Sequence, residues 1–268
     1  MFLEHSPIIK APNIDEAWEE WFGTITAEAG KAESRDGDVV GEVLNAVTII
    51  EDPTRCILKS PIRNLPMRYM IGELLWYLSG NSSLKAIQLY THAWDRMSDD
   101  GKYVNSNYGN RIQVATCEHS GKFFNQLEMV EKLLKKDPNS RQAVIHIKQA
   151  RNLIDYPTKD VNCTVCLQFF IRKGKLSLTT YMRSNDLWMG YPNDIFQFTA
   201  IQIYLAMRLG VELGCYTHIA GSLHLYERDY KIALKNIEAQ ANTTVDGVPA
   251  LKRKENSDGG HKTFTENF

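Results

Sequence analysis

Two short apolar runs joined by a turn constrain the fold of this chain more than any other feature. Residues 166–171 and 176–182 are rich in aliphatic, aromatic and β-branched side chains, and Lys173-Gly174 lies between them. Runs of this length on either side of a glycine-containing turn are typical of a β-hairpin. We therefore predict a hairpin, and with it a sheet, in the second half of the chain.

Chemically useful side chains lie at the open end of this hairpin. Cys163 comes just before its first strand, and the polar residues 183–186 follow its second strand. Gly190 and Pro192 then break the pattern, and a long apolar helix is expected to begin near Ile195. Polar groups crowded between two apolar elements predict a pocket at this end of the sheet.

Several short motifs occur in an order that resembles the thymidylate synthase superfamily. The resemblance spans roughly residues 34 to 230 and rests on residues 72–78, Trp94-Asp95, Tyr108-Gly109, residues 137–141, Cys163 with Gln168-Phe169, Arg183-Ser184 with Asp186, Gly190 with Pro192 and Asp194-Ile195, and residues 221–226. Within the superfamily, residues 105–109, residues 183–186 and Asn193-Asp194 look more like the deoxycytidylate (dCMP) hydroxymethylases of phages.

The resemblance implies a fold of the α/β (α+β) class. We expect a large, mixed, twisted sheet packed with helices around a long buried central helix, and we expect the sheet to form the interface of a homodimer. A single catalytic domain would cover residues 1–268, with 241–268 as a mobile tail.

The resemblance also implies roles for particular residues. The catalytic set would be Cys163 as nucleophile, Glu73 as general acid/base, Asp194 at the pyrimidine, and Tyr108. The nucleotide would contact Arg35, Arg183, Ser184, Asn185, Asp186, His224 and Tyr226, and Arg141 would come from the partner subunit. The co-substrate 5,10-methylenetetrahydrofolate would contact Trp94, Asp186 and Gly190, and no metal is expected.

A cysteine suits the first step of such a reaction. C5 of a pyrimidine is a weak nucleophile at neutral pH, and addition of a thiolate to C6 turns the ring into an enamine or enolate that reacts at C5. The thiol must be partly ionised, and by resemblance the guanidinium of Arg183 would lower its pKa. Cys163 and Cys166 also have a metal or redox spacing, but neither a second cysteine pair nor paired histidines lie nearby, so we read Cys166 as a core residue.

Four of these candidates also allow plain structural interpretations. The pattern alone favours a solvent-facing Glu73, whereas the resemblance favours a buried carboxyl whose pKa is raised. Arg35 could be a solvated loop charge, and His224 a structural histidine at a strand end. Asp194 could cap a helix that begins at Ile195, with or without a role at the base.

Asp194 predicts the base of the nucleotide. Uracil presents a donor at N3 and an acceptor at O4, whereas cytosine presents an acceptor at N3 and a donor amine at N4. The dUMP enzymes of the family carry an asparagine at this position, while a carboxylic acid, or a carboxylate facing N3-protonated cytosine, matches cytosine. A buried mismatch costs about 1–3 kcal/mol per unsatisfied group, so Asp194 favours dCMP over dUMP.

Composition narrows the class of substrate and the compartment. The 268 residues are 43% hydrophobic and 24% charged, enough for a full core, and the formal net charge of −1 gives no general attraction to nucleic acid. We therefore expect the substrate to be a small phosphate ester that is bound by arginines at specific positions. No apolar run approaches the roughly 18 residues of a membrane span, and the five scattered cysteines indicate reduced thiols. We expect a cytoplasmic protein, in a host's cytoplasm if the phage likeness holds.

Periodicity predicts the remaining elements. We expect helices at 14–25, 66–78, 83–94, 123–136 and 195–209, strands at 39–50, 143–147 and 216–225, and a loop at 95–108.

Four departures from the family bear on the product and on phosphate binding. Met97 stands where thymidylate synthases carry another tryptophan, residues 105–107 are polar, and residues 264–268 do not match the usual hydrophobic ending. These three favour water, positioned by Glu73, over hydride as the group that completes the reaction. Gln142 replaces the second of two adjacent arginines, which leaves Arg141 alone.

The sequence therefore predicts folate-dependent hydroxymethylation of dCMP at C5. The first alternative is C5 methylation of dCMP or dUMP with hydride from the folate. An alternative of a different class is a catalytically silent relative that binds nucleotide or nucleic acid, and the presence of Cys163, Glu73 and Arg183 argues against it.

Overall fold

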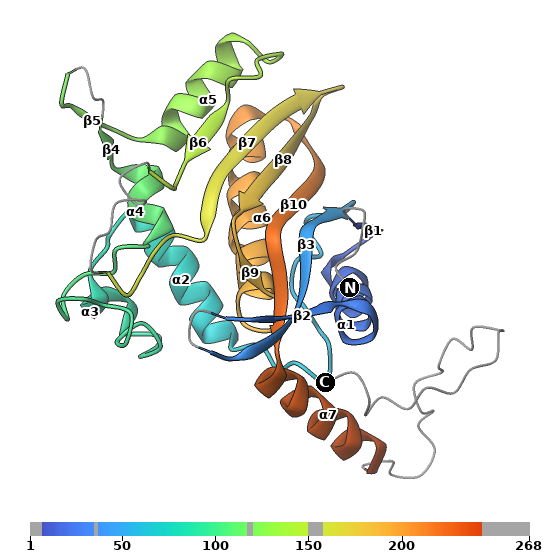
Figure 1. The fold of residues 1–268 in the computed structure, drawn as a ribbon. Helices are drawn as coiled ribbons and strands as arrows, with labels where there is room; N and C mark the ends of the chain where they lie inside the picture. The colour runs from blue at the N-terminus through green and yellow to red at the C-terminus, as the bar shows by residue number, and fades with distance from the viewer. Residues whose placement is uncertain (1–6, 35–36, 117–119, 150–157, 243–268) are drawn as a thin grey trace.

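A computed structural model describes residues 7–34, 37–116, 120–149 and 158–242 (Figure 1). The elements in chain order are β1 (Ile8–Ala11), α1 (Ile14–Glu28), β2 (Gly30–Glu33), β3 (Val39–Ile50), α2 (Met67–Ser79), α3 (Leu84–Ile87), α4 (Tyr108–Gln113), β4 (Ala115–Thr116), β5 (Phe123–Phe124), α5 (Gln126–Lys136), β6 (Val144–His146), β7 (Thr164–Arg172), β8 (Lys175–Met182), β9 (Asn185–Asp186), α6 (Gly190–Leu209), β10 (Glu212–Tyr226) and α7 (Glu227–Asn242).

The central sheet is mixed, as predicted. Its strand order is β1-β3-β10-β8-β7-β6, with β2 paired to β3 and β9 paired to β10. The β7–β8, β6–β7 and β3–β10 pairs are antiparallel, whereas β10 runs parallel to β8 and to β9. The long strand β10 therefore lies within the sheet and pairs with β3, β8 and β9.

The β7–β8 hairpin confirms the first prediction from the sequence. Its two turn residues, Lys173 and Gly174, have φ angles of 51° and 72°. Two successive positive φ values are those of the tight turn that matches the twist of paired strands. Thr164 pairs with Met182 at the end of the hairpin opposite the turn. Cys163 and Arg183, the next residues along the two chains, therefore leave the sheet at the same place.

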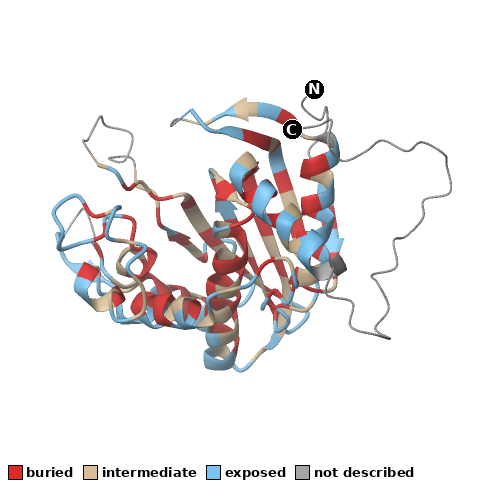
Figure 2. Ribbon diagram, turned by 90° about the horizontal axis from the view of Figure 1, so that it is seen from below, coloured by how far each residue is buried: buried red, intermediate tan, exposed pale blue. Residues whose placement is uncertain are grey.

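The central helix α6 is longer than predicted. It begins at Gly190, five residues before Ile195, because Pro192 falls in the first turn, where a missing N–H costs no helical hydrogen bond. Most of its apolar residues are buried, including Ile195 and Phe198 at 0% exposure, whereas Tyr204 and Met207 near its end are exposed. Figure 1 shows α6 behind β7, β8 and β10, and in Figure 2 the buried residues gather between the helices and the sheet. This helix carries Asp194 from its first turns into the interior.

The N-terminal helix α1 covers the other end of the sheet. Asn13 caps it by accepting a hydrogen bond from the amide of Glu16, as its position before the apolar pattern predicts. Trp18 and Trp21 are fully buried. The indole of Trp18 donates to the carbonyl oxygen of Leu187 at 2.9 Å. Both tryptophans are core residues, and Trp18 also supports the segment between β9 and α6.

Two further predicted helices have wrong boundaries, and one predicted loop ends in a helix. The helix expected at 83–94 ends at Ile87, because the ring of Tyr90 packs on Gly72 of α2 and this contact overrides local propensity. The helix expected from 123 begins at Gln126 after the cap Asn125, and residues 123–124 form β5. Tyr108 opens the helix α4 rather than ending a loop, and α7 was not predicted.

Cys166 does not lie in the core, contrary to the prediction. It alternates with the buried Leu167 and points to the face of the sheet opposite α6, where it is half-exposed. The residues that share this face are half-exposed or exposed: Gln168 and Phe170 of β7, Ser177, Thr179 and Tyr181 of β8, and Cys215, Thr217 and Ile219 of β10. The four described cysteines, Cys56, Cys163, Cys166 and Cys215, are free thiols.

Two classes of feature are absent from the described ranges. No helix there is long and apolar enough to cross a bilayer. The same residues contain no cluster of three or more His, Cys, Asp or Glu side chains that could hold a metal ion.

Candidate active site

Cys163 and Arg183 lie together at the open end of the hairpin. The amide of Arg183 donates to the carbonyl oxygen of Cys163 at 2.9 Å, which joins the two strand ends. The guanidinium donates to the carbonyl oxygens of Asn162 (3.1 Å) and Val161 (3.2 Å). Its Nη2 atom also lies 3.5 Å from Sγ of Cys163. The structure thus places a cation directly beside the predicted nucleophile.

The pKa of the Cys163 thiol is nevertheless raised. Burial is the largest cause, and the carboxyl groups of Asp194 and Asp160 add to it. Arg183 lowers the pKa as expected, and Lys148, which the sequence did not single out, acts in the same direction. Because burial outweighs the two cations, the thiolate is a minor species at neutral pH until a further interaction favours it.

Glu73 is buried, so the solvent-facing interpretation is wrong. It is 3% exposed on the inner side of α2. Its Oε1 accepts from the hydroxyl of Tyr69 at 2.8 Å and of Tyr77 at 3.3 Å, and its Oε2 accepts from the amide of Gln197 at 3.1 Å. Burial raises the pKa of Glu73 to about 7, although these three hydrogen bonds lower it. A carboxyl with this pKa can both donate and accept a proton near neutral pH.

Asp194 lies within α6 and does not cap it, because the helix begins at Gly190 with Met189 at the N-cap position. Its Oδ2 accepts a hydrogen bond of 2.7 Å from the side-chain amide of Asn185. Burial raises the pKa of Asp194 well above its usual range, and the nearby carboxyl of Glu73 adds to this rise. The hydrogen bond from Asn185 opposes this rise, and the balance shifts Asp194 toward its neutral form.

Tyr108 completes the cluster from α4. Its ring packs between those of Tyr77 (centroids 5.5 Å apart) and Phe198 (6.1 Å). Its hydroxyl accepts from the amide of Thr164 at 3.3 Å, directly after Cys163 in the chain. Burial raises its pKa well above the usual range, and Asp194 and Cys163 contribute to the rise. The four predicted catalytic residues thus converge from α2, α4, α6 and the start of β7.

Asp186 and His224 are direct neighbours on the parallel strands β9 and β10. Oδ1 of Asp186 accepts from the amides of Trp188 (2.8 Å) and Met189 (3.2 Å), which closes the turn before α6. Burial raises the pKa of Asp186, while His224 opposes this rise. The ring of His224 meets that of Tyr226 edge-on at 5.2 Å. The predicted pair His224 and Tyr226 therefore lies on the same strand face as Asp186.

The predicted phosphate contacts are only partly described. Ser184 is half-buried between β8 and β9, and Arg35 lies outside the described residues. Arg228 forms an ion pair with Asp38. The guanidinium of Arg228 also lies 4.0 Å above the ring of Tyr226. Asp38 is thereby joined to the end of β10.

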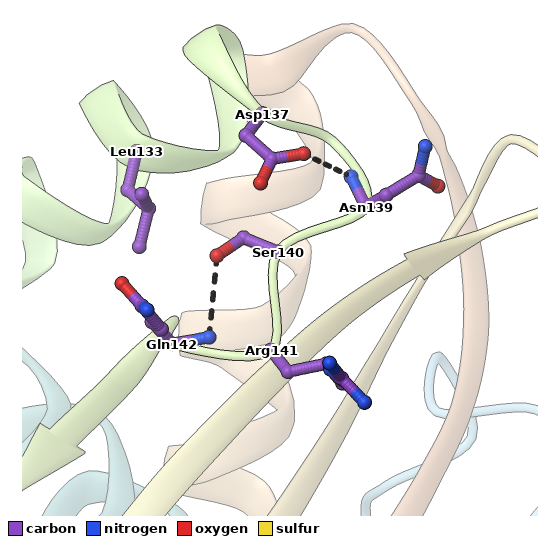
Figure 3. Close-up of a pocket in the computed structure, with 6 residues that line it drawn as sticks. All are labelled: Leu133, Asp137, Asn139, Ser140, Arg141 and Gln142. Carbon is purple, nitrogen blue, oxygen red and sulfur yellow. Dashed lines mark hydrogen bonds between the residues drawn. The ribbon is translucent and has the colours of Figure 1, made fainter.

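Arg141 is not close to Cys163 in the same subunit. Its carbonyl oxygen accepts from the side chain of Gln168 at 3.0 Å, and five residues of strand separate Gln168 from Cys163, about 17 Å of extended chain. Arg141 lines a pocket of about 260 Å³ with Leu133, Asp137, Asn139, Ser140 and Gln142. Figure 3 shows its guanidinium extending away from Leu133 and Gln142. Within the part of the chain that Figure 1 draws as ribbon, neither this hydrogen bond nor this pocket brings Arg141 to the cluster.

Of the residues predicted to contact the folate, Trp94 is suitably exposed, whereas Gly190 has a different role. Trp94 packs on Trp76 with ring centroids 5.7 Å apart and remains half-exposed, so it offers an aromatic surface to a flat ring. Gly190 is used differently, because a Cβ there would lie 3.0 Å from Nδ2 of Asn185 and 3.2 Å from Oδ2 of Asp194. Gly190 thus leaves room for the hydrogen bond between these two side chains.

The sequence missed most of the groups that support the cluster. Tyr69 and Tyr77 stand four residues before and after Glu73, so helical periodicity could have found them. Gln197 binds Glu73 from a different helix, 124 residues away in the chain, and no local signal marks it. Lys148 and His218 were missed for the same reason.

The fold and this cluster define the class of protein. The chain matches the family described as thymidylate synthase over residues 17–265, and it belongs to that family. Members of the family use methylenetetrahydrofolate as a co-substrate.

The chain is also similar to a named phage protein. Over 210 residues the chain is 35% identical to a protein named deoxyuridylate hydroxymethyltransferase, from Bacillus phage SP01. The match covers 73% of this chain and 55% of that protein, so the chain spans little more than half the length of this relative.

Proposed function

We propose that this protein catalyses folate-dependent hydroxymethylation of dCMP at C5. The observation that carries the proposal is the carboxyl at position 194, held neutral by burial and hydrogen-bonded to Asn185, in the same cluster as Cys163 and Glu73. One-carbon transfer to a pyrimidine nucleotide is the chemistry of the family, and the printed name of the phage relative supports a hydroxymethyl product.

A neutral Asp194 can pair with cytosine when its proton lies on the oxygen that faces N3. In this form Asp194 has one O–H donor and one carbonyl acceptor, which can pair with N3 and the N4 amine of cytosine. An ionised carboxylate could only accept, and it would leave N3 of neutral cytosine without a donor. The raised pKa of Asp194 therefore favours the protonation state that recognition of dCMP requires.

Each residue of the cluster has a defined task in this reaction. Sγ of Cys163 forms a bond to C6, and the electron pair of the C5–C6 double bond makes C5 nucleophilic. Arg183 and Lys148 stabilise the thiolate that does so. The folate, when bound, supplies a one-carbon unit at the oxidation level of formaldehyde. Glu73, with a pKa of about 7, accepts the proton that C5 loses and holds the water that adds to the new carbon after tetrahydrofolate has left. The bond between Sγ of Cys163 and C6 then breaks, which restores the C5–C6 double bond and releases the thiolate.

Water rather than hydride is proposed to complete the reaction. The polar residues 105–107 do not simply widen the site. The amide of Ser106 donates to Asp160, and Asn162 donates to the carbonyl oxygen of Ser106, so this segment holds the chain just before Cys163. Met97 and the name of the phage relative remain as support.

A homodimer is proposed to complete the phosphate site. Arg141 is distant from Cys163 of its own subunit, and the face of the sheet opposite α6 carries half-exposed side chains such as Phe170, Tyr181 and Ile219. A second copy packed on this face would cover these side chains and could bring its Arg141 to the neighbouring nucleotide. The family is generally dimeric.

The test is incubation of the purified protein with methylenetetrahydrofolate and dCMP, dUMP or CMP, followed by mass analysis of the nucleotide. We expect dCMP to gain one CH₂O unit. Gain of one CH₂ unit with formation of dihydrofolate would replace the proposal by methylation, and no product with any nucleotide would contradict it. The Cys163→Ser protein is the control, because it should give no product.

The second candidate is hydroxymethylation of dUMP. The name of the phage relative favours it, since that protein is called a deoxyuridylate hydroxymethyltransferase. The same experiment separates the two substrates, because equal or greater conversion of dUMP would contradict the assignment of Asp194 as a selector of cytosine.

A further inference from the structure

A buried histidine lies behind the hydrogen bond between Asn185 and Asp194. His218 is on β10 and is 1% exposed. Its Nε2 atom lies 3.0 Å from Oδ1 of Asn185, and its Nδ1 atom lies 2.8 Å from the hydroxyl of Tyr216. The ring of Tyr191 packs against it edge-on at 5.4 Å. The imidazole is thus enclosed with a polar partner on each nitrogen.

The identity of these partners determines where the proton of the imidazole lies. Burial lowers the pKa of His218 to about 3, so the ring is neutral and carries one N–H. Oδ1 of an asparagine can only accept, so Nε2 must donate to it. Nδ1 then has a lone pair, and the hydroxyl of Tyr216 donates to it. The chain of hydrogen bonds therefore runs in one direction, from Tyr216 through His218 to Asn185.

This direction fixes the amide of Asn185. With its oxygen bound to His218, the NH₂ group of Asn185 points to Oδ2 of Asp194 at 2.7 Å. Gly190 lies against the same bond, and its missing Cβ leaves the space that the two side chains occupy. Oδ2 of Asp194 is therefore an acceptor in every state. Since a carbonyl oxygen accepts better than a hydroxyl oxygen, the acid proton of Asp194 is placed on Oδ1.

The position of this proton matters because a neutral carboxyl is ambiguous. With the proton on the oxygen that faces N3, it matches cytosine. With the proton on the oxygen that faces the exocyclic group, it donates to O4 and accepts from N3–H, which matches uracil. Protonation of Asp194 alone cannot distinguish the two bases, and selection requires that the proton stay on one oxygen.

We propose that Tyr216, His218 and Asn185 form a positioning relay that holds the proton of Asp194 on one oxygen and so determines which pyrimidine the enzyme accepts. The inference rests on the proposed function and adds a specificity-determining residue, His218, that does not touch the substrate. The groups that face Asp194 and raise its pKa, Glu73 and Asp186, favour the presence of the proton but do not choose its oxygen.

The test compares His218→Phe with His218→Gln. Phenylalanine fills the space without a donor, whereas glutamine can donate to Asn185 and accept from Tyr216. We measure kcat/KM for dCMP and for dUMP and take their ratio, which is independent of the fraction of folded protein. In His218→Phe the ratio should move toward unity by at least about fivefold, the effect of losing one buried hydrogen bond. His218→Gln should stay within about threefold of wild type.

A ratio unchanged within about twofold in a folded His218→Phe protein would overturn the relay. If that variant does not fold, Tyr216→Phe serves instead, and it should move the ratio in the same direction by a smaller amount. A wild-type enzyme that prefers dUMP would refute the proposed substrate, whereas a shift toward unity in His218→Phe would still support the relay. If neither nucleotide reacts, the proposed function fails, and the ratio of the two dissociation constants, measured by calorimetry, tests the relay alone.

Discussion

Nη2 of Arg183 lies 3.5 Å from Sγ of Cys163, while the same guanidinium binds the carbonyl oxygens of Val161 and Asn162. Arg183 therefore acts on the nucleophile in two ways. Its charge favours the thiolate, and its hydrogen bonds hold the backbone from which the thiol extends. The two effects can be separated, because lysine retains the charge but cannot reproduce the forked contacts.

We expect Arg183→Gln to raise the pKa of Cys163 and to slow its alkylation by iodoacetamide at neutral pH about three- to tenfold, since one close cation is lost. Arg183→Lys should lie between this variant and wild type. Arg172→Gln is the matched control, because Arg172 lies at the other end of the same hairpin. Labelling is assigned by mass spectrometry of the peptide that contains Cys163. An unchanged alkylation rate in Arg183→Gln would contradict the electrostatic role.

Glu73 should make stability depend on pH. Its folded pKa of about 7 is above the unfolded value of 4.5, so the stability that it contributes is fully present below pH 4.5 and is lost as the pH rises through 7. The whole change is on the order of 3 kcal/mol. Glu73→Gln should remove most of this dependence between pH 5 and 8, as measured by urea unfolding, and should abolish product formation.

The matched comparison for Glu73 is Glu131→Gln on α5. Glu131 pairs with Lys135 and Arg208, and these cations lower its pKa. Its contribution to stability is therefore present above the unfolded pKa and is lost as the pH falls, the reverse of Glu73. If both variants changed the pH profile in the same direction, the assignment of the raised pKa to Glu73 would be wrong.

Asp194→Leu should remove the base preference. Leucine fills the space but offers neither the donor at Oδ1 nor the acceptor at Oδ2. We expect kcat/KM for dCMP to fall by about 5- to 150-fold and the ratio of dCMP to dUMP to move toward unity, as the cost of one unsatisfied buried group predicts. Steady-state kinetics with both nucleotides measures this. A parallel loss with both bases would indicate a structural role for Asp194.

The hairpin, α1, α2 and the central helix could be predicted because their signals are local. Turn residues, caps and apolar periodicity lie within each segment, as at Lys173 and Asn13. The pairing of motifs into one cluster was accessible only through family resemblance. Neither the local signals nor the family resemblance predicted contacts between distant segments, such as Gln197 with Glu73 and His218 with Asn185. Cys166 was misassigned because alternation along β7 shows that two faces exist but not which one is covered.

Gly190→Ala should damage the site without destabilising the fold. The new Cβ would lie 3.0 Å from Nδ2 of Asn185, which cannot retreat because His218 holds its other end. We expect kcat/KM for dCMP to fall about three- to tenfold through displacement of Asp194. Gly23→Ala in α1 is the control, since its Cβ meets nothing within 4 Å. That change should stabilise the protein by up to about 1 kcal/mol and leave activity intact. Equal activity of both variants would show that the bond between Asn185 and Asp194 tolerates displacement.

Mixed subunits can test whether Arg141 serves the neighbouring site. Cys163→Ser abolishes the nucleophile but leaves its own Arg141 available to a partner, whereas Arg141→Ala keeps the nucleophile. In a mixed dimer, one of the two sites would combine an intact Cys163 with an intact Arg141 from the other subunit. Refolding the two inactive or weakened variants together at equal amounts should therefore recover about a quarter of wild-type activity, since half of the dimers are mixed and each has one complete site. Activity no greater than that of the Arg141→Ala protein alone would mean that Arg141 does not reach the neighbouring nucleotide. Size-exclusion chromatography of each variant confirms that the loss of activity is not a loss of the dimer.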